Sequence, residues 1–178
     1  MGFEVTFKIK MRPKESMPEL KLSLINGAIF NLAEQNAKNF TILYFYRGLH
    51  CPICKKQLES ITRHLSDFEE RGVNVCAISM DDKDRALKTE EEWDVESLPI
   101  AYGLDEDKAR ELGLYISKAI SDKEPDHFSE PGIFLVNSDN NLYFSSIQTM
   151  PFARPSVENV LSAIDFIKKE DYPARGAY

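Results

Sequence analysis

Two cysteines three positions apart, Cys51 and Cys54, are the residues of this chain best suited to chemistry. One helical turn would place their Cα atoms about 5–6 Å apart, which is within disulfide range. The pair lies between an apolar, strand-like run, Phe40 to Tyr46, and a helical pattern. A C-x-x-C pair beside a strand–helix unit indicates a redox centre that cycles between dithiol and disulfide.

The helix after the pair is predicted from apolar residues that step by three and four: Cys54, Leu58, Ile61, Leu65 and Phe68. Pro52 suits the first turn, and Gly72 after Arg71 suits the end, so one helix is expected from Cys51 to Arg71. Free N–H groups and the helix dipole at such a start favour a thiolate, and such sites lower a cysteine pKa to roughly 3.5–7.5.

The expected division of labour is an exposed Cys51 that attacks and a more buried Cys54 that resolves. Arg47 and His50, close in sequence, are expected to add positive charge beside the attacking thiol.

Two other interpretations of the cysteine pair remain. The cysteines could be structural zinc ligands, but the chain offers only Cys76 and three histidines to complete a four-ligand site, with no second paired motif, and we predict no metal. They could also be inert core residues, which is the interpretation we favour for Cys76.

Composition bounds the class of protein. A chain of 178 residues suits one domain, 1–178, with a core at about 20–168 and a loosely held tail at 169–178. A net charge of −7 and a pI near 5.1 make nucleic acid and anionic membrane poor partners. We find no apolar run near ~20 residues, no signal-peptide pattern and too few cysteines for a disulfide framework, and we therefore expect a cytoplasmic protein.

The remaining elements are read from periodicity and caps. Asn26-Gly27 between apolar alternations predicts a hairpin over Leu20 to Leu32, and Glu4 to Lys10 reads as an edge strand. The region from Tyr115 to Ser129 is expected to be irregular, and its His127 could be a catalytic base, although a solvated loop histidine is the interpretation we favour. Further strands are expected at Val73–Met80, Pro99–Leu104, Gly132–Val136 and Leu142–Ile147. Further helices are expected after Asp81 or Asp82, at Glu106–Leu112 after Asp105, and from Pro155–Ser156.

This order of elements resembles the thioredoxin fold, with a central mixed β-sheet flanked by helices. The N-terminal hairpin and the inserted strand–helix resemble the peroxiredoxin branch, the alkyl hydroperoxide reductase and thiol-specific antioxidant group. The stretch Tyr46 to Leu58 carries the Y-R-G-x-x-C-P-x-C-x-x-x-L pattern of a peroxiredoxin-like subgroup. The resemblance covers roughly Leu20 to Lys168.

The resemblance also carries expectations for single residues. Pro131 matches the cis-proline that faces the thiols in this superfamily. Two positions depart from the peroxiredoxin pattern. Gly48 stands where a Thr or Ser is usual, and Glu130 stands where an Arg is usual, so groups that polarise the peroxide are missing there. Whether Arg154 folds back to replace that Arg is left open.

The resemblance implies a thiol oxidoreductase in which Cys51 attacks a peroxide or a disulfide, Cys54 closes an intramolecular disulfide and an external thiol of thioredoxin or glutathione type reduces it. No cofactor is implied, and the resemblance is compatible with a homodimer. One alternative is a disulfide reductase or glutathione-dependent thiol transferase without peroxidase activity. An alternative of another class is a non-catalytic redox sensor or binding module.

Overall fold

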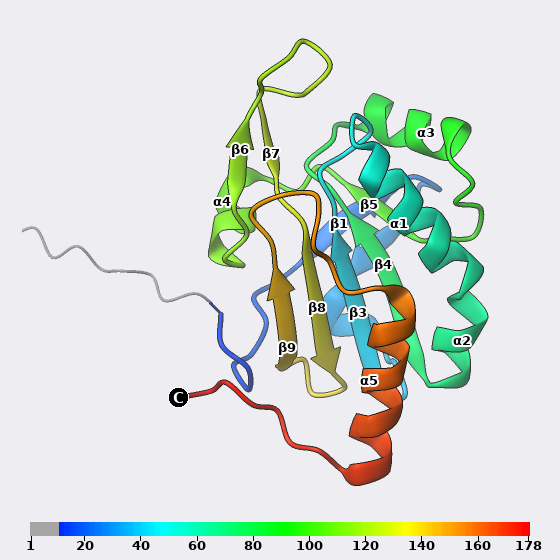
Figure 1. The fold of residues 1–178 in the computed structure, drawn as a ribbon, viewed down its shortest axis with the longest axis vertical. Coiled ribbons are helices and arrows are strands. Elements are labelled where there is room, and N and C mark those ends of the chain that lie inside the picture. The colour runs from blue at the N-terminus through cyan, green and yellow to red at the C-terminus, as the bar shows by residue number, and fades with distance from the viewer. Residues whose placement is uncertain (1–10) are drawn as a thin grey trace, which may run out of the picture.

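A seven-stranded mixed sheet forms the centre of the fold in the computed structural model, which describes residues 11–178 (Figure 1). Its strand order is β2-β1-β5-β4-β3-β8-β9. These strands are β1 (Lys21–Leu24), β2 (Ile29–Asn31), β3 (Phe40–Phe45), β4 (Val73–Ile78), β5 (Ile100–Tyr102), β8 (Gly132–Asn137) and β9 (Leu142–Ile147). The edge strand expected at Glu4 to Lys10 lies outside the described residues.

The strand β3 lies in the middle, and all six of its residues are buried. It pairs in parallel with β4 and antiparallel with β8, with Phe45 opposite Gly132 at the end where the C-x-x-C loop begins. A continuous apolar run is what a strand covered on both faces requires. The expected thioredoxin-like sheet is therefore confirmed.

Helices cover both faces of this sheet. They are α1 (Pro52–Arg63), α2 (Leu65–Glu70), α3 (Lys83–Glu92), α4 (Glu106–Glu111), α5 (Val157–Glu170) and a short 3₁₀ turn, Leu32–Glu34. One core lies beneath α1, α2 and α5 and takes Ile42 and Tyr44 from β3. The other lies beneath α4 and the N-terminal segments and takes Leu43 and Phe45. Successive side chains of β3 point to opposite faces of the sheet and therefore pack into two separate cores, one on each face.

Several local predictions are confirmed. The Asn26-Gly27 hairpin joins β1 to β2, with Gly27 at φ +85°. Asp105 and Ser156 cap α4 and α5 through their side chains. Of the two candidates ahead of α3, Asp82 is the cap.

Two predictions are wrong. The helix expected from Cys51 to Arg71 is interrupted at His64, which separates α1 from α2 and has non-helical backbone angles (φ −109°, ψ 12°). The Nδ1 atom of its ring lies 2.8 Å from the Ser60 carbonyl oxygen. The region expected to be irregular contains an antiparallel pair, β6 (Ile116–Lys118) and β7 (His127–Ser129). Strands of three residues carry too little alternation to be recognised in a sequence.

The interruption at His64 generates a stability prediction. Leu58 is fully buried under α1, whereas Leu65, placed on the same stripe by the sequence, is only partly buried. We expect Leu58→Ala to lower the free energy of unfolding by about 2–5 kcal/mol, as fully buried leucines do. The matched variant Leu65→Ala should cost clearly less. Urea unfolding of both variants measures this, and equal losses would indicate one continuous buried stripe.

Candidate active site

The dithiol lies at the start of α1, as expected. Cys51 is the N-cap residue and Pro52 the first helical residue, and the Cys51 sulfur accepts a hydrogen bond from the Cys54 N–H at 3.2 Å. Both cysteines are free thiols. The expected exposure of Cys51 is wrong, because its exposed fraction is 1%, against 0% for Cys54. The loop before the helix and the segment ahead of α5 enclose both sulfurs.

The surroundings shift the pKa values of the two thiols in opposite directions. A hydrogen bond from the Cys54 thiol, the Cys54 N–H and the charge of Arg154 lower the pKa of Cys51 to about 6, although burial opposes this. Burial and the adjacent Cys51 thiol raise the pKa of Cys54 above its ordinary value. Near neutral pH the pair therefore holds one thiolate, on Cys51, and one thiol, on Cys54.

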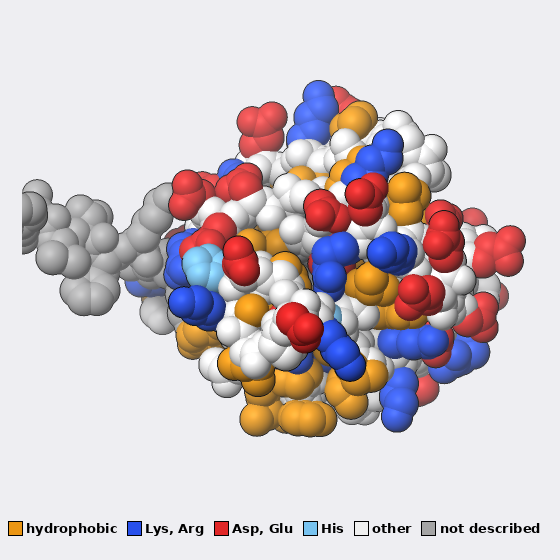
Figure 2. Space-filling model, turned by 90° about the horizontal axis from the view of Figure 1, so that it is seen from above, with side chains coloured by type: hydrophobic (Ala, Val, Ile, Leu, Met, Phe, Trp, Pro, Cys, Tyr) orange, Lys and Arg blue, Asp and Glu red, His pale blue; other side chains and the backbone are white. Residues whose placement is uncertain are grey.

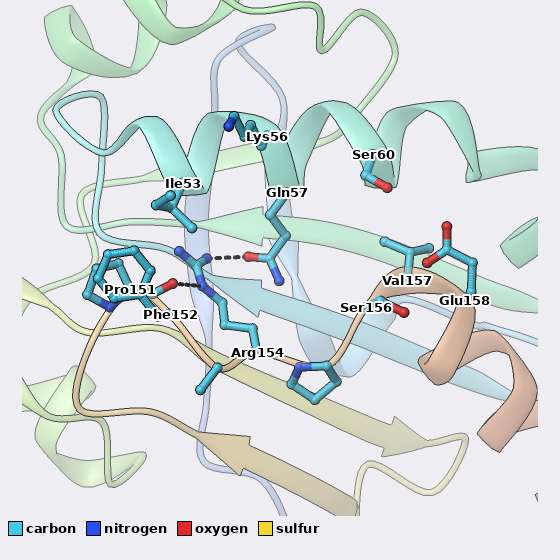
Figure 3. A pocket seen from close by; sticks show the side chains of 12 residues that line it. Ile53, Lys56, Gln57, Ser60, Pro151, Phe152, Arg154, Ser156, Val157 and Glu158 are labelled. Atoms are coloured by element: carbon cyan, nitrogen blue, oxygen red, sulfur yellow. Dashed lines mark hydrogen bonds between the residues drawn. The ribbon is translucent and has the colours of Figure 1, made fainter.

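Arg154 folds back over the dithiol from the segment ahead of α5. Its Nη2 lies 3.3 Å from the Cys54 sulfur and 4.0 Å from the Cys51 sulfur. Its Nε donates to the Pro151 carbonyl at 2.6 Å, and its Nη1 donates to the Gln57 side chain (Figure 3). These two hydrogen bonds fix the orientation of the guanidinium. Its positive charge is therefore held at the sulfurs by hydrogen bonds to Pro151 and Gln57 as well as by attraction to the thiolate.

Arg47 and His50 belong to a second cluster, and only Arg47 adds positive charge. Arg47 Nε lies 3.3 Å from Glu130 Oε2, and its guanidinium covers the Phe128 ring at 4.7 Å. Its contribution to the low pKa of Cys51 is smaller than that of Arg154. Burial, together with the charges of Arg47 and Arg85, lowers the pKa of His50 to about 4. His50 is therefore neutral at pH 7, and the expectation that it supplies charge is wrong.

Gly48 is held against a buried carboxylate. Its φ is +129°, and an added Cβ would lie 2.6 Å from an oxygen of Asp81. That carboxylate accepts hydrogen bonds from the Leu49 N–H at 2.8 Å and from Arg85 Nε at 2.9 Å. No side chain fits at position 48 in this arrangement, which explains physically why the usual Thr or Ser is absent.

Pro131 lies where expected, directly before β8 and at the same end of the sheet as the dithiol. The predicted cis bond is wrong, because residues 11–178 contain no cis peptide bond and the Glu130–Pro131 bond is trans. The trans bond suits the contacts on either side. The Glu130 N–H donates to the Tyr115 carbonyl at 2.7 Å, and the Glu130 carboxylate accepts from Ser117 at 2.7 Å. Glu130 is thereby tied to β6, so the peptide ahead of Pro131 is part of a sheet-like connection.

The remaining candidates lie apart from this arrangement. Cys76 is buried in the core on the opposite face of the sheet from the dithiol, and burial raises its pKa strongly. His127 is exposed on β7 and lies 2.8 Å from Glu106. Neither residue contacts the two thiols of the C-x-x-C motif. This agrees with the interpretation of Cys76 as a core residue and of His127 as a surface residue.

A groove of about 400 Å³ lies between α1 and the segment ahead of α5 (Figure 3). Ile53, Lys56 and Gln57 line it from α1, and Phe152, Arg154 and Val157 line it from the other side. Arg154 thus contacts the sulfurs with one part of its guanidinium and forms the wall of the groove with its side chain. No local pattern in the sequence indicates this groove, because its two walls are about a hundred residues apart.

The surface around the start of α1 is chemically mixed. Figure 2 shows Lys and Arg side chains interspersed with Asp and Glu over this end of the molecule, with hydrophobic side chains gathered along one edge. No helix within residues 11–178 is long and apolar enough to cross a membrane. In the same part of the chain, no group of three or more His, Cys, Asp and Glu side chains is arranged to hold a metal ion.

Comparisons with known proteins agree with this arrangement. Residues 13–145 match the model of the AhpC/TSA family. A 1-Cys peroxiredoxin of Medicago truncatula is 23% identical over 163 residues, which are 87% of this chain and 72% of that protein. A 1-Cys peroxiredoxin A of rice, Oryza sativa subsp. japonica, is 22% identical over 86% of this chain and 71% of its own length.

Solved structures share the fold. The peroxiredoxin 6 of Arenicola marina superposes with a TM-score of 0.77 at 18% identity, over 90% of this chain and 75% of that one. AhpC of Mycobacterium tuberculosis superposes with a TM-score of 0.74 at 12% identity, over 93% and 98% of the two chains. The family match covers most of the chain, and the fold and the placement of the dithiol agree with it. The chain therefore belongs to the AhpC/TSA family, and with it to the thiol-dependent oxidoreductases.

Proposed function

We propose that this protein is a two-cysteine peroxidase in which Cys51 attacks the peroxide and Cys54 resolves the product. The observation that carries the proposal is the unequal thiol pair in the first turn of α1, one sulfur stabilised as a thiolate and the other kept as a thiol. Thiolate is the nucleophilic form, and the thiol one turn away is placed to close a disulfide.

The chemistry balances without a cofactor. The Cys51 thiolate forms an S–O bond with one peroxide oxygen, the O–O bond breaks, and the leaving oxygen departs as water or alcohol after taking a proton. Cys51 is then a sulfenic acid. The Cys54 thiol condenses with it, forming the Cys51–Cys54 disulfide and releasing one water. An external thiol returns the two electrons.

Arg154 supports the first step. As the O–O bond breaks, negative charge grows on the leaving oxygen, and a fixed guanidinium close to the sulfurs lowers the energy of that charge. The carboxylates of Glu130 and Glu124 pair with Arg47, whereas the described contacts of Arg154 are a neutral amide, a carbonyl and the two sulfurs. We therefore infer that Arg154 supplies the positive charge that peroxiredoxins usually take from an Arg at the position of Glu130.

Gly48 favours a second candidate, a disulfide reductase without peroxidase activity. The hydroxyl that usually polarises the peroxide is missing, and Asp81 leaves no room for one. Attack on a disulfide needs no such group, because the leaving group is a thiolate. A homodimer and a thioredoxin- or glutathione-like reductant stay predictions of the family resemblance.

The acidity of Cys51 can be measured directly. We expect the rate of alkylation by iodoacetamide to rise with pH through an inflection near 6, and Cys51→Ser to remove it. Arg154→Met should move the inflection up towards the ordinary ~8.5, because the thiolate loses a neighbouring cation. Lys55→Met is the matched control, since Lys55 binds the Glu92 carbonyl and should leave the inflection unchanged. An inflection near ~8.5 in the wild-type protein would refute thiolate stabilisation.

The peroxidase and reductase proposals are separated by stopped-flow mixing with hydrogen peroxide, followed by trapping of free thiols. We expect one peptide to lose two hydrogens across Cys51 and Cys54, and Cys54→Ser to accumulate a dimedone-reactive sulfenic acid on Cys51. Cys76→Ser should behave as the wild type, since Cys76 lies on the opposite face of the sheet. If peroxide leaves the pair reduced while a low-molecular-weight disulfide oxidises it, the reductase assignment replaces the peroxidase one.

A further inference from the structure

The loop that joins β3 to α1 lies beside the start of α3 (Figure 1), where the buried carboxylate of Asp81 holds it. The Leu49 N–H donates to Asp81 Oδ2 at 2.8 Å. The backbone of Gly48 lies so close that an added Cβ would be 2.6 Å from Asp81 Oδ1. The Gly48 carbonyl in turn accepts a hydrogen bond from the Cys51 N–H at 3.1 Å. Asp81 therefore contacts the turn that ends at the attacking cysteine.

Asp81 is also fixed by contacts that do not involve this loop. Its N–H donates to Ser79 Oγ at 3.3 Å, and its carbonyl accepts from the Gly103 N–H at 2.8 Å, so its backbone is tied to the segments that follow β4 and β5. Its second carboxylate oxygen, Oδ1, accepts from Arg85 Nε at 2.9 Å. The side chain is 0% exposed, and a buried carboxylate that loses a hydrogen-bond partner is costly. Movement of Leu49 away from this carboxylate is therefore opposed.

Arg85 makes a second contact with the loop. Its Nη2 lies 3.4 Å from His50 Nδ1 and donates to the Lys123 carbonyl at 3.5 Å. An arginine only donates hydrogen bonds, so Nδ1 is the acceptor and the ring proton of the neutral His50 is on Nε2. The ring of Phe128 packs against the His50 ring, with their centroids 4.7 Å apart. The residue directly before Cys51 is thus oriented by Arg85 and Phe128.

The geometry of this loop decides how Cys51 enters α1. Cys51 has extended backbone angles (φ −104°, ψ 103°), and this N-cap conformation brings its sulfur to the Cys54 N–H. The groups that lower the pKa of Cys51 directly are Cys54, Arg154 and Arg47. Asp81 hydrogen-bonds the backbone ahead of Cys51 instead, so that any effect it has on the sulfur passes through the loop.

We propose that Asp81 and Arg85 are positioning residues for Cys51, which act through residues 48–50 and hold its sulfur at the first turn of α1. This role goes beyond the proposed function, because it is the same whether the thiolate attacks a peroxide or a disulfide. It also has a characteristic sign. Removal of a negative charge favours a nearby thiolate by Coulomb interaction alone, whereas release of the loop disfavours it.

The test follows alkylation of Cys51 by iodoacetamide against pH in the full chain, with the modified cysteine identified by tandem mass spectrometry. We expect the inflection near 6 to rise by about one pH unit in Asp81→Ala, because the thiolate loses the hydrogen bond from the Cys54 N–H. Asp81→Asn removes the same charge but keeps an oxygen for the Leu49 N–H, so its inflection should rise by less. Circular dichroism and slow alkylation of the buried Cys76 check that each variant folds. The nearly isosteric Asn variant decides the sign if the Ala variant does not fold.

Two further variants provide the controls. Asp82→Asn removes the same charge one residue away and keeps the cap of α3, so it should leave the inflection unchanged. Gly48→Ala places a Cβ against Asp81 and should raise the inflection. In the double variant with Asp81→Ala the two shifts should be less than additive, since both disturb one contact. An inflection that stays or falls in the Asp81 variants, an equal rise in Asp82→Asn, or additive shifts would overturn the proposal.

Hydrogen exchange gives a readout that needs no chemistry at the thiols. The Leu49 amide should exchange at least about tenfold faster in Asp81→Ala than in the wild type, the effect of one lost hydrogen bond. The Cys54 amide should also exchange faster, because its bond to the Cys51 sulfur depends on the same loop. Unchanged protection at Leu49 would mean that Asp81 does not hold the loop.

The proposed function is judged separately, by consumption of peroxide. A protein that consumes no peroxide but shows the rise in the Asp81 variants would refute the peroxidase proposal and keep the positioning role. A protein that consumes peroxide and whose inflection does not respond to Asp81 would do the reverse.

Discussion

A thiolate at Cys51 is a charge held in a nearly closed site, and much of the surrounding structure compensates for that burial. Removing an unpaired charge from water is expensive. The first turn of α1 provides the Cys54 N–H, the adjacent thiol provides a hydrogen bond, and Arg154 provides a cation. The Cys54 N–H reaches the Cys51 sulfur because Cys51 is the residue that caps α1. The position of the helix start is therefore the constraint on which the chemistry depends.

Buried charges near the site are paired with one another, with the exception of Arg154. Asp81 is held by Arg85 and the loop N–H of Leu49, and Glu130 is held by Arg47 and Ser117. These pairs fix the loop that precedes Cys51 and neutralise its charges. A loop rich in free cations would lower the pKa of Cys51 further, but it would also attract any anion. Pairing leaves the Arg154 guanidinium, which contacts the sulfurs, as a larger source of positive charge at Cys51 than Arg47.

The sequence predicted the fold and the dithiol well because both depend on local patterns. The continuous apolar strand β3, the apolar spacing of α1 and the Asn26-Gly27 turn are short-range features, each with a direct physical cause. Exposure and charge at the site were predicted poorly. Cys51 was expected to be exposed and His50 to be charged, and both expectations failed because burial depends on segments remote in the chain. The cis bond predicted at Pro131 is also absent, and the contact between Glu130 and β6 is a further feature that the sequence does not reveal.

The position of Arg154 shows how a site can keep a charge while its sequence motif changes. The family's usual Arg would come from the second residue before β8, but here that residue is Glu130, which forms an ion pair with Arg47. The cation comes instead from the segment ahead of α5, about a hundred residues after Cys51, where the Pro151 carbonyl and Gln57 orient it. A cation supplied from that side does more than replace the missing one, because its side chain also forms the wall of a groove. Charge stabilisation at the sulfurs and the shape of the neighbouring groove then depend on the same residue.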